Sequence, residues 1–246
     1  MEMVDLEKKA PAPLVSLAKS AKVVLEKRGL ATHTAAVGLC MDISGSMQGL
    51  FNKGVVQRLV ERVMGLGLNF DDNGAIDLFA FGVDAHDLGE CPADRFEGSA
   101  ARILDRTGFE GGTRYAPAIK LILKHYGFKG GVLSGLFGGG AKAGPRPQPV
   151  YMLFVTDGEN SDLVEARQAI VEASKFPVFF QFVGIGGGTF KFLRELDTMS
   201  GRLIDNANFF EVEDPSAIPE SQLYESMMAE YPSWVGLAKE KNLLTR

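Results

Sequence analysis

The sequence predicts a doubly wound α/β fold, in which helices cover both faces of a mostly parallel central sheet. Apolar runs typical of strands alternate with segments of helical periodicity along nearly the whole chain. The runs at 36–41 and 150–155 are apolar at every position, as strands covered on both faces must be. With 246 residues, 46% of them hydrophobic, the chain is long enough to form one large domain with a sizeable core.

Each strand is expected where a short apolar run ends at polar or glycine residues, and each helix where apolar side chains recur every three or four positions. The segment 83–90 is expected to add a short antiparallel edge strand, which mixed sheets tolerate. In chain order, the expected strands are 35–42, 75–82, 150–157, 178–186 and 207–212, and the expected helices are 53–66, 99–105, 116–126, 162–174, 190–199 and 216–230.

An amphipathic helix is expected near the amino terminus, after Pro11 and Pro13 and ending near Gly29. Its lysines lie off the apolar stripe, so we expect the stripe to pack on the domain. A membrane surface or a partner helix is the alternative for this stripe, which consists of Leu14, Leu17, Ala18, Ala21, Val24 and Leu25.

The charge pattern excludes two classes of partner. The formal net charge is −5, and no cluster of lysine and arginine marks a surface for nucleic acid or for an anionic membrane. No apolar run approaches the roughly 20 residues of a membrane span, and the first residues do not resemble a secretory signal. Cys40 and Cys91 lack the spacing of a metal or redox pair. We therefore expect a cytoplasmic protein with reduced thiols.

The segment 127–149 contains eight glycines and is too long for an ordinary connection between a helix and a strand. We expect a flexible insertion at the end of the sheet opposite the ligand-binding strand ends. Its apolar residues could dock on a partner or pack back on the domain; they are Val132, Leu133, Leu136 and Phe137. The expected organisation is a helical extension over 1–30, the α/β domain over 31–215 and a second helical extension over 216–246, packed on the same domain.

Five oxygen-bearing side chains are expected to converge at one edge of the sheet. The first apolar run ends at Asp42 and continues into Ser44 and Ser46, a later run ends at Asp157, and a glycine-containing loop carries Thr113. Carboxylate and hydroxyl oxygens without sulfur or imidazole suit a hard cation such as Mg²⁺. The alternative is that the serines cap a helix and the two aspartates complete strand-to-helix turns.

The motifs DISGSM, GGT and VTDGEN, taken together and in this order, resemble the metal-ion-dependent adhesion site of the von Willebrand factor type A (vWA) domain, a Rossmann-like fold. The resemblance covers roughly residues 30–215. It implies that Ser44 and Ser46 ligate the metal directly, that Thr113 does so directly or through water, and that Asp42 and Asp157 act mainly through water or hydrogen bonds. The two terminal helical segments and YPSW resemble the bacterial tellurium-resistance (Ter) branch of this family.

The resemblance implies a binding module rather than an enzyme. Mg²⁺, or Mn²⁺ or Ca²⁺ in its place, would accept an Asp or Glu carboxylate from a protein partner, in bacterial stress or tellurium resistance. Arg114 could steer such an acid, or could be a solvated loop residue.

A Mg²⁺-dependent hydrolase or phosphatase is the alternative function, since a metal beside carboxylates can activate water. Such an enzyme would need a base, a nucleophilic aspartate or a second metal, and His33, His86 and His125 lie on other segments. The chain has no G-x-S-x-G motif and no P-loop, and GIGGGT does not complete G-x-G-x-x-G.

Overall fold

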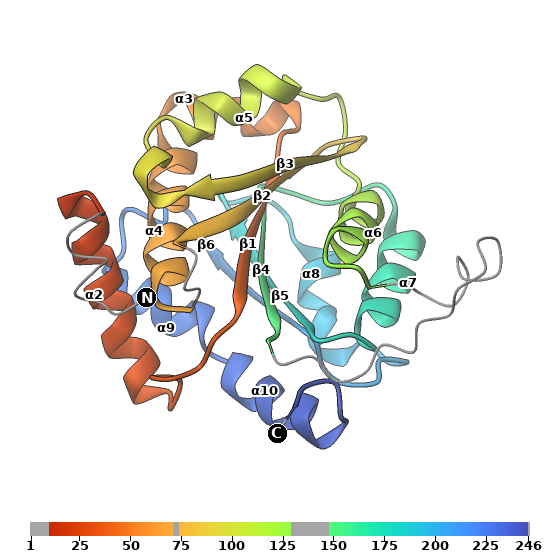
Figure 1. Cartoon of the computed structure of the whole chain (residues 1–246). Coiled ribbons are helices and arrows are strands. Elements are labelled where there is room, and N and C mark those ends of the chain that lie inside the picture. The colour runs from red at the N-terminus through yellow and green to blue at the C-terminus, as the bar shows by residue number, and fades with distance from the viewer. Residues whose placement is uncertain (1–9, 71–73, 129–147, 246) are drawn as a thin grey trace.

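The computed structural model describes residues 10–70, 74–128 and 148–245 (Figure 1). In this part of the chain, six strands form one sheet in the order β3-β2-β1-β4-β5-β6. Neighbouring strands are parallel except β3, which pairs antiparallel with β2 at the edge of the sheet. The expected fold class, including its antiparallel edge strand, is confirmed. The strands are β1 (Ala36–Asp42), β2 (Ala75–Phe81), β3 (Ala85–Pro92), β4 (Val150–Thr156), β5 (Val178–Ile185) and β6 (Ala207–Val212).

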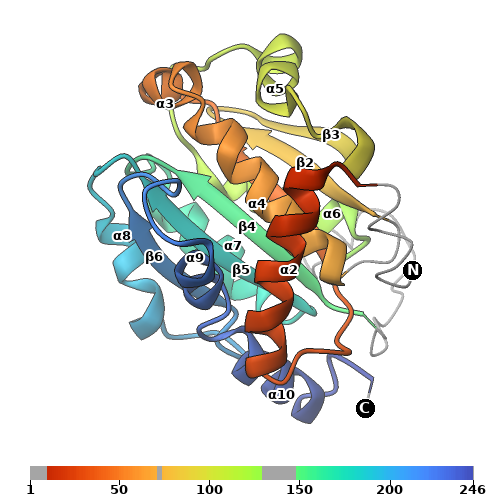
Figure 2. The ribbon, with the colours of Figure 1, turned by 90° about the vertical axis from the view of Figure 1, so that its left-hand side faces the viewer.

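Helices lie on both faces of this sheet, with α2, α4 and α9 on one side and α6 and α7 on the other (Figures 1 and 2). Successive residues of β1 alternate between two hydrophobic clusters, since Met41 packs on the side of α4 and Cys40 on the side of α6. The helices are α2 (Ala12–Lys27), α3 (Gln48–Asn52), α4 (Val55–Phe70), α5 (Ser99–Thr107), α6 (Tyr115–His125), α7 (Leu163–Ala173), α8 (Lys191–Arg194), α9 (Glu220–Met227) and α10 (Tyr231–Glu240).

The amino-terminal helix α2 packs its apolar stripe into the domain. All six stripe residues are buried, as the core-facing interpretation predicts. Close approach to α4 depends on Gly65, where an added Cβ would lie 2.7 Å from the Cβ of Leu17. In the described part of the chain, no helix is both long and apolar enough to cross a bilayer.

Two expected helices differ from the structure. The expected helix 216–230 is wrong in its bounds, because Pro219 disfavours helical backbone at the residue before it, and α9 begins only at Glu220. A separate helix, α10, follows and tolerates Pro232 within its first turn. The expected helix 190–199 is divided into α8 and the 3-10 turn Leu196–Thr198, both of which bury apolar side chains.

The glycine-rich segment falls mostly outside the described residues. Its expected flexibility stays a prediction, as does the role of its four large apolar residues, because 129–147 are not described. The residue that closes the segment, Pro149, accepts a hydrogen bond of 2.9 Å from the backbone of Ala36 at the amino end of β1.

Candidate metal centre

The site forms where the order of the strands reverses. From β1 the chain builds the sheet outward through β2 and β3 on one side, and through β4, β5 and β6 on the other. Crevices for ligands in α/β sheets lie beyond the carboxyl ends of strands at such a point. Met41 pairs with Val155, so the aspartates that follow them closely, Asp42 and Asp157, leave neighbouring strands at the same edge.

A chain of hydrogen bonds connects three of the five expected site residues. The hydroxyl oxygens of Ser44 and Ser46 lie 3.0 Å apart, and the Ser46 hydroxyl donates to Oδ1 of Asp157 over 2.8 Å. The loop reaches this shape because the Ser44 amide donates to Oδ1 of Asp42 over 2.7 Å, after which Gly45–Met47 form a 3-10 turn. The turn brings both serine side chains beside Asp157.

Asp42 is a fully buried carboxylate. Burial raises its pKa to about 6, and hydrogen bonds from Thr156 and Ser44 oppose that rise. Burial also raises the pKa of Asp157, against a hydrogen bond from Ser46. In the described part of the chain, neither aspartate forms an ion pair with a basic side chain. Two carboxylates that lack a positive partner in the described residues therefore follow neighbouring strands at the same edge of the sheet, which is an electrostatic setting that a bound cation would stabilise.

Thr113 reaches the same edge of the sheet through its backbone. It lies in the loop between α5 and α6, and its carbonyl oxygen accepts hydrogen bonds from the amide and the hydroxyl of Ser161, at 2.9 and 3.1 Å. Ser161 follows Asp157 by four residues in the loop after β4. Thr113 is half-buried, and the contacts that join it to the Asp157 loop are made by its carbonyl oxygen.

Glu110 anchors the loop that carries Thr113, and sequence reasoning missed it. Its backbone accepts from Gly45 and donates to Ile43, each at 2.9 Å, so this loop runs beside the exit of β1. Its carboxylate accepts from the Asp84 amide at 2.8 Å and contacts Nε2 of His86 at 2.6 Å. These partners lie 24 to 26 residues away, so no local sequence pattern reveals them.

Asp162 is a second missed residue, and it joins the Asp157 loop to α6. Its two carboxylate oxygens accept from the backbone amides of Tyr115 and Ala116, at 2.9 and 2.8 Å, in the first turn of that helix. The Tyr115 hydroxyl in turn donates to the carbonyl of Gly158 over 2.9 Å. The backbone that follows Asp157 is thus fixed by hydrogen bonds to the first turn of α6.

The donor set fits a hard divalent cation. All five expected ligands offer oxygen, from two carboxylates and three hydroxyls. Among the described residues, no group of three or more His, Cys, Asp or Glu side chains is arranged to hold a metal. A cation at this edge would therefore depend on the serine and threonine hydroxyls as well as on the carboxylates.

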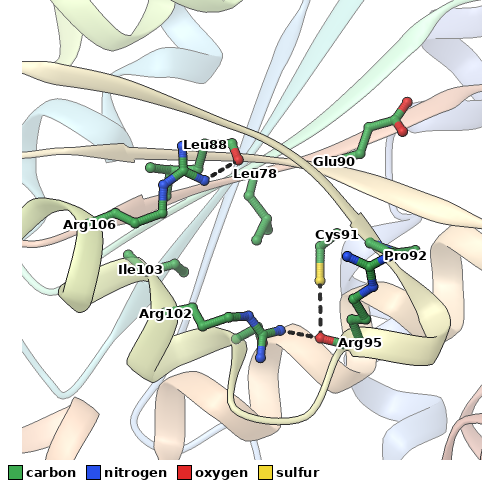
Figure 3. A pocket seen from close by; sticks show the side chains of 10 residues that line it. Leu78, Leu88, Glu90, Cys91, Pro92, Arg95, Arg102, Ile103 and Arg106 are labelled. Carbon is green, nitrogen blue, oxygen red and sulfur yellow. Dashed lines mark hydrogen bonds between the residues drawn. The ribbon is translucent and has the colours of Figure 1, made fainter.

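A separate pocket of about 180 Å³ lies between β3 and α5 and does not include any of these residues (Figure 3). Leu88 is the extra residue of a β-bulge in β3, and its backbone carbonyl accepts a hydrogen bond from Arg106. Arg102 likewise donates to the carbonyl of Arg95. These arginines satisfy backbone oxygens of β3 and of the turn that follows it.

Comparisons with known proteins agree with the expected family. "Uncharacterized protein YcbR" of Bacillus subtilis is 36% identical over 248 residues, covering 99% of this chain and 91% of that protein. "Protein BONZAI 1" of Arabidopsis thaliana is 37% identical over 57 residues, which are 23% of this chain and 10% of that protein.

Among solved structures, proximal thread matrix protein 1 from the mussel byssus, described with a zinc-occupied MIDAS motif, has a TM-score of 0.45 and 18% identity. The match covers 80% of this chain and 47% of that one. The family described as vWA-TerF-like, a vWA found in the TerF C terminus, matches residues 34–244. The chain therefore belongs to the vWA-TerF-like family of von Willebrand factor A domains.

Proposed function

We propose that this chain is a metal-dependent protein-binding module. A divalent cation, Mg²⁺ or else Mn²⁺ or Ca²⁺, would be held by Asp42, Ser44, Ser46, Thr113 and Asp157 and would bind an Asp or Glu carboxylate of a partner. The observation that carries the proposal is the hydrogen-bonded chain of Ser44, Ser46 and Asp157 beside a buried Asp42 without a basic partner in the described residues.

The balance of charge in this donor set favours binding of an outside carboxylate. Serine and threonine hydroxyls are neutral, so they leave most of the charge of a divalent cation uncompensated. When bound, the cation would supply a strong, directional site for an anionic oxygen. Ser46 is exposed and Asp157 is half-buried, so a partner's side chain can reach this edge of the sheet.

A hydrolase would need a base near the proposed ligands, and the histidines are engaged elsewhere. His33 contacts the Tyr231 hydroxyl, His86 contacts Glu110, and His125 contacts Asp87. None of these contacts involves a proposed metal ligand. This arrangement supports binding over catalysis, and a phosphatase assay with Mg²⁺ and Mn²⁺ tests the alternative directly.

The biological setting is proposed from the family alone. Its description refers to TerF, so we propose a role in bacterial stress or tellurium resistance, carried out in the cytoplasm. The cation would make the contact with the partner reversible, because removing the metal removes the charge that binds the partner's carboxylate most strongly.

Calorimetric titration of the whole chain with Mg²⁺, Mn²⁺ and Ca²⁺ tests the proposal. Asp42→Ala and Ser44→Ala should abolish binding, while circular dichroism shows a folded sheet. Ser226→Ala is the matched control, because it removes a hydroxyl that donates to the backbone carbonyl of Gln222 within α9, away from the proposed ligands. Unchanged metal affinity in both site variants would show that the cation does not bind there.

A further inference from the structure

Large apolar side chains are exposed on both sides of the metal site. In the described part of the chain, seven large hydrophobic residues are exposed, and four of them lie on loops or a helix start at the carboxyl edge of the sheet. These four form what we call the apolar rim. The rim consists of Val83, Phe109, Leu163 and Val164, with exposed fractions of 41, 38, 48 and 66%.

The strand order separates the rim into two flanks. Val83 follows β2 and Leu163 and Val164 follow β4, while β1, which leads into Ser44, lies between those two strands. Phe109 precedes Glu110, whose backbone pairs with Ser44. Val83 also lies close to the Thr113 loop, since its Cγ2 is 3.1 Å from the position of a Cβ on Gly112. A ligand at the metal site would thus have apolar surface on each side.

The core does not require Leu163 and Val164 to be apolar. Helix α7 buries a different face, formed by Ala166, Ala169, Ile170 and Ala173, and leaves Leu163 and Val164 in solvent. Phe109 packs edge-on against Phe51 with ring centroids 5.5 Å apart, which holds its exposed ring in place. Exposed apolar groups that gather around a polar site are typical of a surface that is covered in a complex.

The charges around the rim restrict the partner further. Arg114 is exposed beside Thr113 and, like the proposed cation, would attract a carboxylate. Asp84, Glu159 and Glu165 are also exposed on the same loops and on α7, and they would repel a run of acidic residues. A single acid between apolar neighbours complements this surface better than an acidic cluster does.

We propose that the partner segment presents one Asp or Glu between large apolar side chains, which the apolar rim contacts on either side of the cation. This inference rests on the proposed function and adds what the module recognises. It assigns specificity to side chains that do not touch the metal, so metal binding and partner selectivity can be separated experimentally.

Three capped synthetic peptides test the inference on the whole chain in saturating Mg²⁺. The first places glutamate between leucines (Gly-Leu-Glu-Leu-Gly), the second places it between serines, and the third replaces it by glutamine between leucines. Fluorescence anisotropy of labelled peptides should show at least about tenfold tighter binding of the first peptide than of the other two. EDTA should remove that binding.

The outcomes distinguish the two proposals. Equal affinity for the leucine and serine peptides, both lost in EDTA, would overturn the apolar rim while leaving the metal-dependent function intact. Binding that ignores EDTA, or that accepts glutamine as readily as glutamate, would overturn the metal-dependent function and the inference with it. If neither glutamate peptide binds, the metal-dependent function and the inference are both overturned as well.

Substitutions locate the selectivity on the protein. Val164→Ser should reduce the preference for leucine over serine peptides several-fold and leave calorimetric Mg²⁺ affinity unchanged. Val23→Ser is the control, because Val23 is similarly exposed, at 51%, on α2 outside the rim. A preference that survives Val164→Ser and the double variant with Leu163→Ser would show that the rim beside β4 does not contact the partner.

Discussion

The hydroxyl of Thr156 donates a hydrogen bond of 2.6 Å to Oδ2 of Asp42, and these residues end the neighbouring parallel strands β4 and β1. Both residues are fully buried. The other carboxylate oxygen of Asp42, Oδ1, accepts a hydrogen bond from the Ser44 amide, so both oxygens of this carboxylate are held in place. If a cation binds as proposed, Thr156 would act on it through Asp42, as an outer partner that orients a ligand.

Thr156→Val should therefore weaken metal binding without touching the metal. The substitution keeps the shape of the side chain and removes the donor, which leaves one oxygen of a buried carboxylate without its hydrogen bond. We expect about a tenfold loss of Mg²⁺ affinity and a loss of about 1 kcal/mol in the free energy of unfolding. Titration calorimetry and urea denaturation measure the two effects. Thr156→Ser keeps the donor and should bind as the unmodified chain does; identical affinity in the Val variant would contradict this role.

The pH dependence of metal binding should report on Asp42. Its pKa of about 6 means that the carboxylate takes up a proton as the pH falls below 6, and this proton competes with the cation. Mg²⁺ affinity should be nearly constant above about pH 7 and fall up to about tenfold for each unit below 6. Calorimetry across this range measures the profile. A flat profile down to about pH 5 would show that the cation does not require Asp42 to be ionised.

The raised pKa of Asp42 also affects the stability of the metal-free chain, which it should favour at acidic rather than at neutral pH. Because the pKa of Asp42 is higher in the folded protein than its ordinary value of 3.8, this group stabilises the fold below 3.8, and the contribution is lost as the pH rises through 6. Asp42→Asn should remove this loss, so at neutral pH the metal-free variant should unfold at a urea concentration equal to or above that of the unmodified chain. A clearly lower midpoint would assign Asp42 a structural role.

His33 should make the fold sensitive to acid. Burial, aided by the charge of Lys239, lowers the pKa of His33 to about 4, and its ring contacts the Tyr231 hydroxyl at 2.9 Å. Since the unfolded chain takes up this proton near pH 6.5, the stability that the neutral ring provides is present above 6.5 and is lost as the pH falls through 4. His33→Gln should flatten the dependence of the urea midpoint on pH within that window. An unchanged slope in the variant would place the acid sensitivity elsewhere.

Periodicity and strand-end chemistry were sufficient to predict the sheet and to place Asp42 and Asp157 after the carboxyl ends of neighbouring strands. The runs that end at Asp42 and Asp157 are apolar at every position because α4 and α6 cover opposite faces of β1 and β4. Local signals also sufficed for α2, whose stripe is visible in sixteen consecutive residues. The start of α9 could have been placed from Pro219 alone.

The residues that support the site could not be predicted in this way. Asp162 caps a helix whose first residue lies 47 positions earlier, and Thr156 bonds to a carboxylate 114 positions earlier. The first contact exists because α6 packs beside α7, and the second because β1 pairs with β4, so the sequence carries no local pattern for either. Glu110 is similar, since its role follows from the path of the Thr113 loop beside the exit of β1.

Gly188 provides a test of how closely the loop after β5 supports Asp157. A Cβ at Gly188 would lie 1.9 Å from the carbonyl oxygen of Asp157, which is backbone and cannot rotate away. A hydrogen bond also joins the segment after β5 to the loop after β4, because the amide of Lys191 donates to the carboxylate of Glu159. Gly188→Ala should therefore displace the backbone that carries Asp157 and break the hydrogen-bonded chain to Ser46 and Ser44.

The expected result is a loss of Mg²⁺ affinity of at least about tenfold, with the sheet still folded, because the clash is confined to two loops at the carboxyl edge. Titration calorimetry and circular dichroism measure the two properties. Gly158→Ala is the matched control, since an added Cβ at Gly158 meets no atom within 4 Å although it adjoins Asp157. If Gly188→Ala binds Mg²⁺ as tightly as Gly158→Ala does, the position of the Asp157 backbone does not determine metal affinity, and Asp157 would then act only through water.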